Sequence, residues 1–487
     1  MNSSANKALI FQGGGSLGAY EAGAYKAIKE ELSQYSRAKG RENEPMFHIV
    51  SGTSIGAINA AILVSYVKEN KTWEGSDERL CEFWKYLSTE SSVEKIPYFT
   101  HYWDFWHRLD RRIASGECAR RYISTKEFIL KGVPNVFVPK APLLDSRFFD
   151  PSNTWYIYDN SPLKESLEKF AKFPISTSFE NDEPRLLLVA VDVQEATPVV
   201  FDSYEKEDGT RKSEYGRYGR MKSDGSAKSQ DNEGFEHIIR YEDGIKSDFV
   251  LASCSIPVNY DYTPLNVETR TLAVEEGQGD DTTMQNSNRP TSYSNSNTSL
   301  RYFWDGGLLA NTPLSQTYIA HIDYWRRVRK LEDNIPSLRF SIINLHPAKQ
   351  EYLPTDYDGV VDRKNDIIYH DRTEFDENIA ALMSDFVRLA NSLIKLAEEK
   401  GASKEELQNI LNWKTKGVLI SIGKQGRYDD LVRGIVDVDF VARLERKNDA
   451  NTVSNKTFDF SKTTIQHLIQ GGYKETKEQL KEVLVME

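Results

Sequence analysis

A serine at position 54 lies in a pentapeptide whose residue types suit nucleophilic catalysis. Gly52-Thr53-Ser54-Ile55-Gly56 fits the pattern G-x-S-x-G, in which the serine occupies a sharp turn between a strand and a helix. The small residues Gly52 and Gly56 let the backbone bend there, and the start of the helix favours developing negative charge. Serine is also a common first residue of a helix, so the pentapeptide alone leaves a plain helix start as an equal alternative.

A glycine-rich loop, residues 13–18 (GGGSLG), comes earlier in the chain. Its spacing fits G-x-G-x-x-G, the pattern of a dinucleotide-binding turn, which expects an acidic residue at the end of the next strand. The next predicted strand ends in residues 51–54 (SGTS) instead. We therefore predict an oxyanion hole whose N–H groups stabilise a tetrahedral oxygen, and nucleotide binding stays as the alternative. The candidate residues are Gly13, Gly14, Gly15 and Gly18.

An aspartate at position 305 is the third candidate. It follows the apolar residues 302–304 and precedes Gly306 and Gly307. This order predicts a carboxylate at the end of a strand, where the two glycines let the backbone approach another segment closely. Such a carboxylate can accept the proton of a serine hydroxyl. Asp-Gly is also the commonest hairpin turn, and by itself the pair favours that simpler interpretation.

Hydrophobic periodicity predicts the elements that position these residues. The predicted strands are residues 8–11, 47–50, 186–193, 338–345 and 435–444, and the predicted helices are residues 19–32, 57–67, 376–400 and 460–484. The first two strands are each followed by a glycine-containing turn and a helix, which implies a parallel sheet with right-handed crossovers. The later apolar runs are continuous, as in strands that are covered on both faces.

Two polar stretches, at about 203–236 and 267–299, interrupt this pattern. They are rich in Ser, Asn, Asp, Gly and Lys and have no periodicity, so we predict surface loops without a catalytic role. We expect a catalytic domain of residues 1–345 that contains both stretches, with a C-terminal α/β extension, residues 346–487, packed on the same unit. The predicted fold class is α/β, with a central, mostly parallel sheet flanked by helices.

Together, the three motifs resemble the patatin-like phospholipase family, whose glycine loop, G-x-S-x-G motif and D-G-G or D-G-A motif occur in this order. The similarity spans nearly the whole chain apart from the two polar stretches. The segments that carry it are residues 13–23 (GGGSLGAYEAG), 51–60 (SGTSIGAINA), 252–257 (ASCSIP), 305–313 (DGGLLANTP) and, as in a bacterial subgroup, 458–461 (FDFS) with Gly472-Tyr473. One departure is Leu17, where family members often carry a basic residue, and it leaves contacts with the substrate headgroup open.

This resemblance implies a serine hydrolase that cleaves carboxylic esters of phospholipids or acylglycerols through an acyl-enzyme intermediate. It implies a Ser-Asp dyad, with Ser54 as nucleophile and Asp305 as proton acceptor, and it requires neither a cofactor nor a metal. The motif glycines Gly52, Gly56, Gly306 and Gly307 would support the dyad. Because a carboxylate is a weaker base than imidazole at neutral pH, we expect the mechanism to depend strongly on the oxyanion hole.

Two other functions remain open at the level of sequence. A Ser-Asp-His esterase of the α/β-hydrolase type would take its histidine from His346 or His370, which follow Asp305 in the order of such triads. We expect both histidines to be structural or surface residues instead. A catalytically inactive lipid-binding relative would keep the fold and break the dyad, but both dyad residues are present.

Composition limits the partners and the compartment. The 487 residues carry a formal net charge of -11, which argues against nucleic acid because a phosphate backbone requires a basic surface. The three cysteines, Cys81, Cys118 and Cys254, are far apart and odd in number, which favours the reducing cytoplasm over a disulfide framework or a zinc site. The polar residues 1–7 do not fit a secretory signal, and no apolar run is long enough to span a membrane.

Any membrane contact is therefore predicted to be peripheral, and one segment is suited to it. Between Phe99 and Ile113, apolar residues recur at helical spacing, with Arg108, Arg111 and Arg112 mostly elsewhere on the same predicted helix. The apolar positions are Phe99, Tyr102, Trp103, Trp106, Leu109 and Ile113. Our hypothesis is a lid or docking surface, and a helix packed on the core is the alternative. A second basic cluster, residues 325–330 (WRRVRK), predicts a helix surface.

Overall fold

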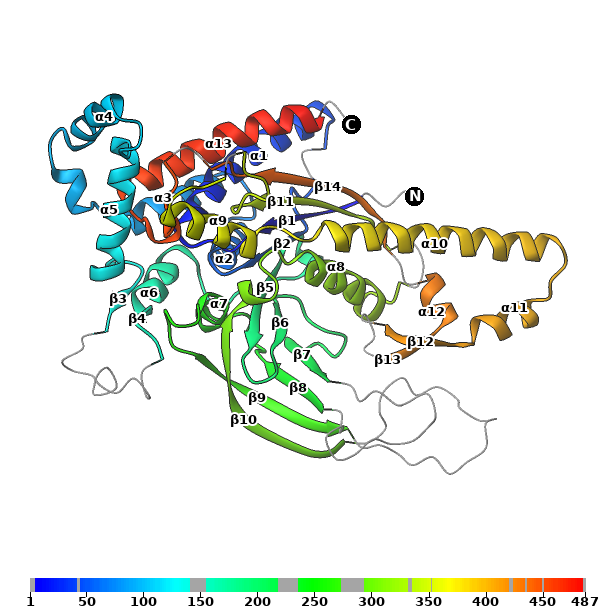
Figure 1. The fold of residues 1–487 in the computed structure, drawn as a ribbon. Coiled ribbons are helices and arrows are strands. Elements are labelled where there is room, and N and C mark those ends of the chain that lie inside the picture. The colour runs from blue at the N-terminus through cyan, green and yellow to red at the C-terminus, as the bar shows by residue number, and fades with distance from the viewer. Residues whose placement is uncertain are drawn as a thin grey trace.

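A ten-stranded mixed sheet forms the centre of the molecule in the computed structural model (Figure 1). The structure describes residues 5–41, 44–140, 155–217, 235–272, 293–331, 335–351, 353–419, 424–433, 436–448 and 451–484. The strands of the sheet are β1 (Asn6–Phe11), β2 (Ile49–Thr53), β5 (Arg185–Asp192), β6 (Thr197–Asp202), β7 (Lys212–Arg217), β8 (Phe235–Arg240), β9 (Thr263–Leu272), β10 (Tyr293–Asp305), β11 (Leu338–Asn344) and β14 (Val438–Glu445). They lie in the order β14-β11-β1-β2-β5-β10-β9-β8-β7, and β6 pairs with β5.

Five neighbouring strands, from β14 to β5, pair in parallel, and β1, β2 and β5 among them are buried almost throughout. The pairs beyond β5 are antiparallel. In β1, Leu9 and Phe11 pack into one layer and Ala8 and Ile10 into the other, and all four are fully buried. Burial on both faces explains the continuous apolar runs of these strands, and the predicted α/β fold with a mostly parallel core is confirmed.

Helices cover both faces of the sheet. They are α1 (Gly18–Ala38), α2 (Ile55–Asn70), α3 (Ser76–Leu87), α4 (Phe99–Leu109), α5 (Gly116–Lys131), α6 (Ser161–Phe170), α7 (Ser247–Cys254), α8 (Leu314–Asp323), α9 (Tyr357–Tyr369), α10 (Glu374–Glu399), α11 (Lys404–Leu411), α12 (Tyr428–Arg433) and α13 (Lys462–Leu484). The side chains of α1, α2 and α3 join the core on one face, and Leu314 and Ile322 of α8 join the core on the other. Each strand and helix that periodicity predicts is present, with ends that differ by a few residues.

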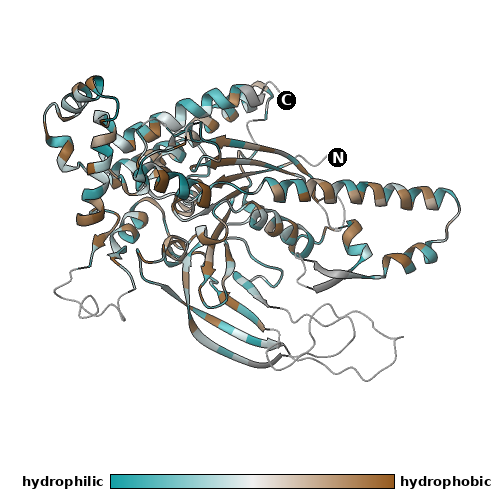
Figure 2. Ribbon diagram, in the orientation of Figure 1, coloured by the Kyte–Doolittle hydropathy of each residue, from teal (hydrophilic) through white to brown (hydrophobic). Residues whose placement is uncertain are grey.

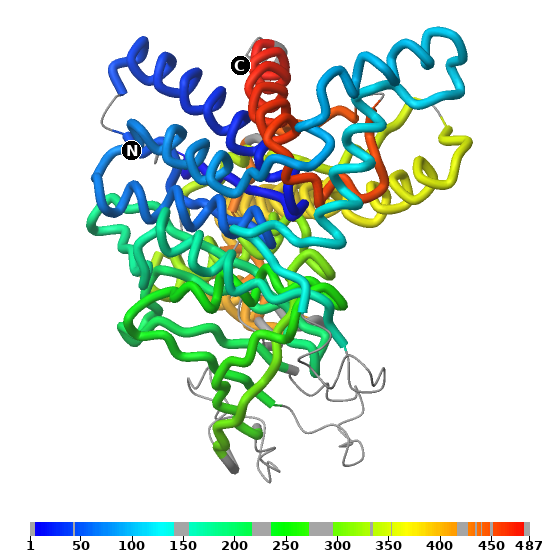
Figure 3. The backbone as a smooth tube through the Cα atoms, turned by 90° about the vertical axis from the view of Figure 1, so that its left-hand side faces the viewer, coloured from blue at the N-terminus to red at the C-terminus, as the bar shows by residue number. Residues whose placement is uncertain are grey.

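Helix α13, near the end of the chain, lies along α1, near its start (Figures 1 and 3). Gly23 of α1 and Gly472 of α13 each face the backbone of the other helix so closely that a methyl group on either would overlap it. The Tyr473 hydroxyl of α13 donates a hydrogen bond of 2.7 Å to the Glu30 carboxylate of α1. The close contact explains why both helices carry glycine despite its low helix propensity.

The polar stretches 203–236 and 267–299 are not loops throughout, so this part of the sequence-based prediction is wrong. They contain β7, the start of β8, the end of β9 and the start of β10, which extend the sheet by antiparallel pairing. In β9, Val267 is buried while Glu268 is not. Antiparallel strands can leave one face in water and so need fewer apolar residues than the buried parallel strands. Residues 218–234 and 273–292 lie outside the described residues.

The predicted helix between Phe99 and Ile113 is shorter than expected. Helix α4 ends at Leu109, and Arg111, Arg112 and Ile113 follow it in a turn. The Arg112 side chain pairs with Asp110, just past the end of the helix, at 2.8 Å. Across the described ranges, no helix has both the length and the apolar character needed to span a bilayer.

Candidate active site

The register of β5 brings the candidate serine and aspartate together. Thr53, the last residue of β2, pairs with Val189, and Asp305, the last residue of β10, pairs with Ala190. The other edge of β5 is occupied by β6. Strands β2 and β10 therefore meet end to end along one edge of β5, and Ser54, which follows Thr53, arrives beside Asp305.

Ser54 occupies the sharp turn that the pentapeptide predicts. Its backbone has φ 56° and ψ -128°, a conformation that non-glycine residues rarely adopt and that raises the side chain above the turn. The Ser54 Oγ donates a hydrogen bond of 2.5 Å to Asp305 Oδ2. Ser54 is 7% exposed and Asp305 is 5% exposed. No imidazole lies between the two side chains, because the hydroxyl contacts the carboxylate directly.

The four motif glycines are needed for close packing around this pair. A methyl group on Gly52 would overlap the backbone of Gly56, and one on Gly56 would lie 2.5 Å from the carbonyl oxygen of Phe11. A methyl group on Gly306 would overlap the backbone of β5, and one on Gly307 would lie 3.0 Å from the Asp305 carboxylate. The absence of a side chain at these four positions therefore lets the turns that carry Ser54 and Asp305 pack closely against neighbouring atoms.

Asp305 is a stronger base than its residue type suggests. Its Oδ1 accepts a hydrogen bond of 2.7 Å from the Gly307 N–H, and its Oδ2 accepts the hydrogen bond from Ser54. Burial raises the pKa of Asp305 to about 7, and these two hydrogen bonds oppose the rise only in part. A pKa near the operating pH is best for a general base, so a carboxylate in this site matches an unperturbed imidazole in basicity.

A segment at the end of α7 holds the pair in place, although we predicted no role for it. The Ser253 hydroxyl accepts a hydrogen bond of 3.0 Å from the Ser54 N–H, and the Cys254 thiol donates one of 3.1 Å to the Ser54 carbonyl. The Ser255 carbonyl accepts a hydrogen bond of 2.9 Å from the Asp305 N–H. The sequence signal that could have predicted this role is the run of three small polar residues, 253–255, within a segment that resembles the family.

The first glycine of the glycine-rich loop lies close to the serine. A methyl group on Gly13 would lie 3.1 Å from the Ser54 Cβ. Gly15 has φ 58°, a left-handed conformation that favours glycine. Within the described ranges, the N–H groups of Gly14 and Gly15 have no protein acceptor, and both residues are partly exposed. These two N–H groups are therefore free donors in a loop whose first glycine contacts Ser54.

Gly13 and Gly18 have their N–H groups engaged. The Gly13 N–H donates to the Asn311 carbonyl at 3.3 Å, a long hydrogen bond. The Gly18 N–H donates to the carbonyls of Gly15 and Ser16. A methyl group on Gly18 would lie 2.6 Å from the Trp84 ring, so Gly18 serves close packing. The prediction that Gly18 contributes to an oxyanion hole is therefore not supported by its position.

Comparison with known proteins identifies the family of the chain. The family model for patatin-like phospholipases matches residues 9–318, more than half of the chain, and this range contains all three motifs. The chain belongs to the patatin-like phospholipase family. Among solved structures, the crystal structure of VipD from Legionella pneumophila matches this chain with 11% sequence identity and a TM-score of 0.27. The match covers 99% of this chain and 68% of that chain, and we draw no conclusion from so low a score. No curated protein matches the chain.

The two histidines considered for a triad have hydrogen-bond partners outside the dyad in this patatin-like protein. The His346 Nδ1 is 3.1 Å from an Asp366 oxygen, and burial lowers the pKa of this histidine. Its Nε2 packs behind Gly14, 3.4 Å from where a methyl group on that glycine would lie. The His370 Nδ1 contacts the Ile367 carbonyl at 2.8 Å. Both positions fit the structural role that we expected for them.

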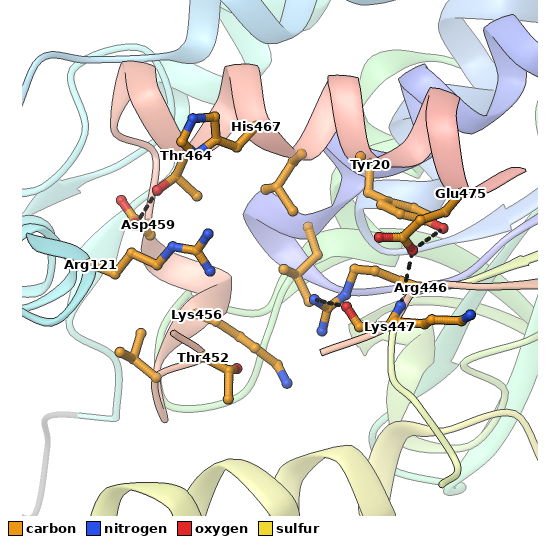
Figure 4. Close-up of a pocket in the computed structure, with 14 residues that line it drawn as sticks. Tyr20, Arg121, Arg446, Lys447, Thr452, Lys456, Asp459, Thr464, His467 and Glu475 are labelled. Carbon is orange, nitrogen blue, oxygen red and sulfur yellow. Dashed lines mark hydrogen bonds between the residues drawn. The ribbon is translucent and has the colours of Figure 1, made fainter. Parts of the chain in front are cut away.

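A cavity of about 130 Å³ lies beside α13, and neither candidate catalytic residue lines it (Figure 4). Four cations, Arg121, Arg446, Lys447 and Lys456, line the cavity together with acidic residues. The Lys456 ammonium lies 2.7 Å from the Asp366 carboxylate and 3.0 Å from Asp362. These two carboxylates neutralise the charge of Lys456 within the protein. Because neither Ser54 nor Asp305 lines the cavity, an ester bound there would not meet Ser54. Across the described residues, no group of three His, Cys, Asp or Glu side chains is placed to hold a metal ion.

Proposed function

We propose that this protein is a lipid acyl hydrolase that cleaves carboxylic esters of phospholipids or acylglycerols. Ser54 is the nucleophile and Asp305 is its proton acceptor. The observation that carries the proposal is the direct hydrogen bond of 2.5 Å between the Ser54 hydroxyl and a buried carboxylate whose pKa is about 7. Membership of the patatin-like phospholipase family supports a lipid as the substrate.

In the first step, Asp305 in its ionised form takes the hydroxyl proton as the Ser54 Oγ attacks the ester carbonyl carbon. The carbonyl oxygen becomes an oxyanion, which the free N–H groups of Gly14 and Gly15 stabilise. The protonated Asp305 then gives its proton to the leaving alcohol, and an acyl-Ser54 ester remains. Water repeats the same sequence on this ester, so that a fatty acid is released and Ser54 is restored.

Apolar side chains beside the dyad support a lipid substrate. Leu308 and Leu309 follow Asp305 closely in sequence and are 46% and 53% exposed. Val258, just beyond the segment that holds the dyad, is 63% exposed. Exposed apolar residues within a few positions of Asp305 and of the segment that holds the dyad can contact acyl chains, which a small polar ester would not need.

Helix α4 supports peripheral contact with a lipid surface. The helix has no buried residue, which argues against the alternative of a helix packed on the core. Its exposed large residues include Tyr102, Phe105, Trp106 and Leu109, and Tyr98 immediately precedes it. Aromatic residues on an exposed amphipathic helix suit the boundary between lipid headgroups and acyl chains. We propose that α4 docks the enzyme on its substrate surface.

We further propose that residues 1–345 form the catalytic domain and that residues 346–487 fold on it as one unit. The support is the close packing of α13 on α1 and the hydrogen bond of 2.7 Å from the Asn311 amide to the Tyr369 carbonyl. We propose a cytoplasmic location because the three cysteines are few, odd in number and far apart in the sequence, as in proteins of a reducing compartment. A chain that ends at residue 345 would expose the apolar face of α1, and an insoluble product is the expected result.

The test is fatty-acid release from phosphatidylcholine vesicles and from long-chain synthetic esters. We expect the wild-type protein to release fatty acid and Ser54→Ala to reduce the rate to background. Ser392→Ala, which changes an exposed serine on α10, is the matched control and should keep full activity. If wild type and both variants are equally inactive on every ester, the protein is instead a lipid-binding relative that does not catalyse.

A further inference from the structure

Helix α10 (Glu374–Glu399) turns its large apolar side chains toward solvent. Seven of them recur at alternating intervals of four and three residues and so form one stripe along the helix: Phe375, Ile379, Leu382, Phe386, Leu389, Leu393 and Leu396. Their exposed fractions range from 43% to 71%. Figure 2 shows hydrophobic residues recurring along this helix, which projects from the body of the molecule as Figure 1 also shows. We name this set the α10 stripe.

The opposite side of α10 holds the helix on the protein. The residues buried there are small, Ala380 at 8% and Ser384 at 6% exposed. Near the start of the helix, Glu377 accepts a hydrogen bond of 2.6 Å from Arg443 of β14. A helix that is fixed to its own chain through small and charged residues leaves its larger apolar side free for something else.

The period of the α10 stripe indicates what would cover it. Apolar residues at alternating intervals of three and four repeat every 3.5 residues on average, which is the pattern of a two-stranded coiled coil. Leu382, Leu389 and Leu396 occupy one of the two core positions of this repeat, which Phe375 also occupies, and Ile379, Phe386 and Leu393 occupy the other. Three consecutive heptads of this kind are matched best by another helix with the same repeat.

The charges of α10 argue against an anionic membrane as the partner. Interfacial helices that bind anionic lipid carry mainly Lys and Arg on their polar face. The acidic residues of α10 are Glu374, Asp376, Glu377, Asp385, Glu398 and Glu399, and its basic residues are Arg388 and Lys395. Arg388 is already paired with Asp437 at 2.5 Å. The helix is therefore acidic, and headgroup phosphates would be repelled from it.

We propose that the α10 stripe binds the α10 stripe of a second copy of this chain, so that the protein is a homodimer joined by a two-stranded coiled coil. Two-fold symmetry uses the same surface twice, and an apolar heptad stripe is complementary to itself. With 26 residues, α10 is about 39 Å long. Seven half-exposed apolar side chains amount to roughly 600 Å² on each copy, so a dimer would bury about 1,200 Å², the lower end of stable interfaces.

Light scattering coupled to gel filtration tests the proposal on the full chain. We expect the wild-type protein at about 10 µM to have twice the 55.7 kDa mass of one chain. Leu389→Lys introduces a charge into the α10 stripe and should give a monomer. Asn391→Lys adds the same charge at an exposed position outside the stripe, two residues further along, and should remain a dimer.

Two results would overturn the proposal. One is a wild-type protein that stays monomeric up to about 50 µM, and the other is Leu389→Lys forming a dimer as well as Asn391→Lys does. Vesicle binding by a monomeric wild type that Leu389→Lys abolishes would assign the stripe to lipid instead. Unchanged circular dichroism shows that the variants fold, and Leu382→Lys, which alters another exposed stripe residue, repeats the test if Leu389→Lys does not fold.

Discussion

The dyad site and helix α10 depart from the usual distribution of polar and apolar side chains in opposite directions. Asp305 and Ser54 are polar residues buried at a junction of strands, whereas the α10 stripe is a row of apolar residues exposed to water. Charged residues are rarely buried without an ion pair, and large contiguous apolar patches are rarely exposed on a monomer. Both arrangements are unfavourable for the isolated chain, so each indicates a role in binding or chemistry that the stability of the fold does not require.

The two departures differ in how local their causes are. The alignment of the apolar residues into a stripe is a property of one helix and follows from the spacing of its residues. The buried carboxylate depends on β2, β5, β10 and the end of α7, which come from separate parts of the chain. A disturbance of any one of these segments should change catalysis, whereas the stripe should tolerate changes elsewhere in the molecule.

The sharpest way to break the buried side of this comparison is Asp305→Asn. Asparagine can still accept the hydrogen bond from Ser54 but cannot take its proton, so we expect kcat/KM to fall on the order of 10⁴-fold. Initial rates on a soluble long-chain ester measure this effect. His346→Gln and His370→Gln together are the matched control and should retain activity within about tenfold. An equal loss in the histidine variant would restore the triad as the mechanism.

The second prediction concerns the free donors of the glycine loop. A methyl group on Gly14 would lie 2.7 Å from the Leu345 side chain, so Gly14→Ala should displace the loop and lower kcat by about 10²- to 10³-fold. Gly471→Ala is the control, because the nearest atom to its added methyl group is 3.9 Å away. Activity of Gly14→Ala within twofold of wild type would show that the loop N–H groups do not hold the oxyanion.

A pH profile sharpens the contrast between Asp305 and an ordinary surface carboxylate. Catalysis needs the ionised form, and burial holds the pKa of this carboxyl at about 7. We therefore expect kcat/KM to rise about tenfold per pH unit below pH 7 and to level off above it. Initial rates between about pH 5 and pH 9, with a soluble ester, locate the midpoint. A midpoint near pH 4 would mean that the carboxylate is solvated and that burial does not tune it.

Asp305 also affects the stability of the fold, which the protonated form favours, whereas catalysis would need the ionised form. The folded-state pKa of Asp305 lies above its usual value of 3.8, so the folded protein binds the extra proton and loses stability as the pH rises from about 4 to about 7. The rise corresponds to about 4 kcal/mol at most. Asp305→Asn should therefore unfold at higher denaturant concentration than wild type at pH 8, and the difference should shrink at pH 4.

The smallest expected effect tests the exposed aromatic residues of α4. Trp106→Ala should weaken binding to phosphatidylcholine vesicles by about three- to tenfold, because one interfacial tryptophan is lost. Trp155→Ala is a matched control, since both tryptophans are 41% exposed and only Trp106 lies on α4. Sedimentation of protein with vesicles measures the change. Equal binding by both variants would contradict the proposal that α4 docks on a lipid surface.

The sequence identified short-range features of this protein correctly. The strands, helices and three motifs depend on residues that are close in the chain, such as the glycines on either side of Ser54 and the apolar run of β1. Turn chemistry and hydrophobic period act over a few residues, so they can be recognised without knowledge of the fold. The antiparallel strands β7 to β10 were missed in part, because strands with one wet face have a weaker apolar signal.

The tertiary structure alone decided how these parts act on one another. Ser54 and Asp305 are 251 residues apart, and only the pairing of β2 and β10 along β5 brings them to 2.5 Å. Burial then raised the pKa of Asp305, which no property of the residue itself predicts. The period of α10 predicted a helix, but not that its large apolar side would face water. Burial is set by the neighbours that a residue acquires on folding, and the sequence around that residue does not contain them.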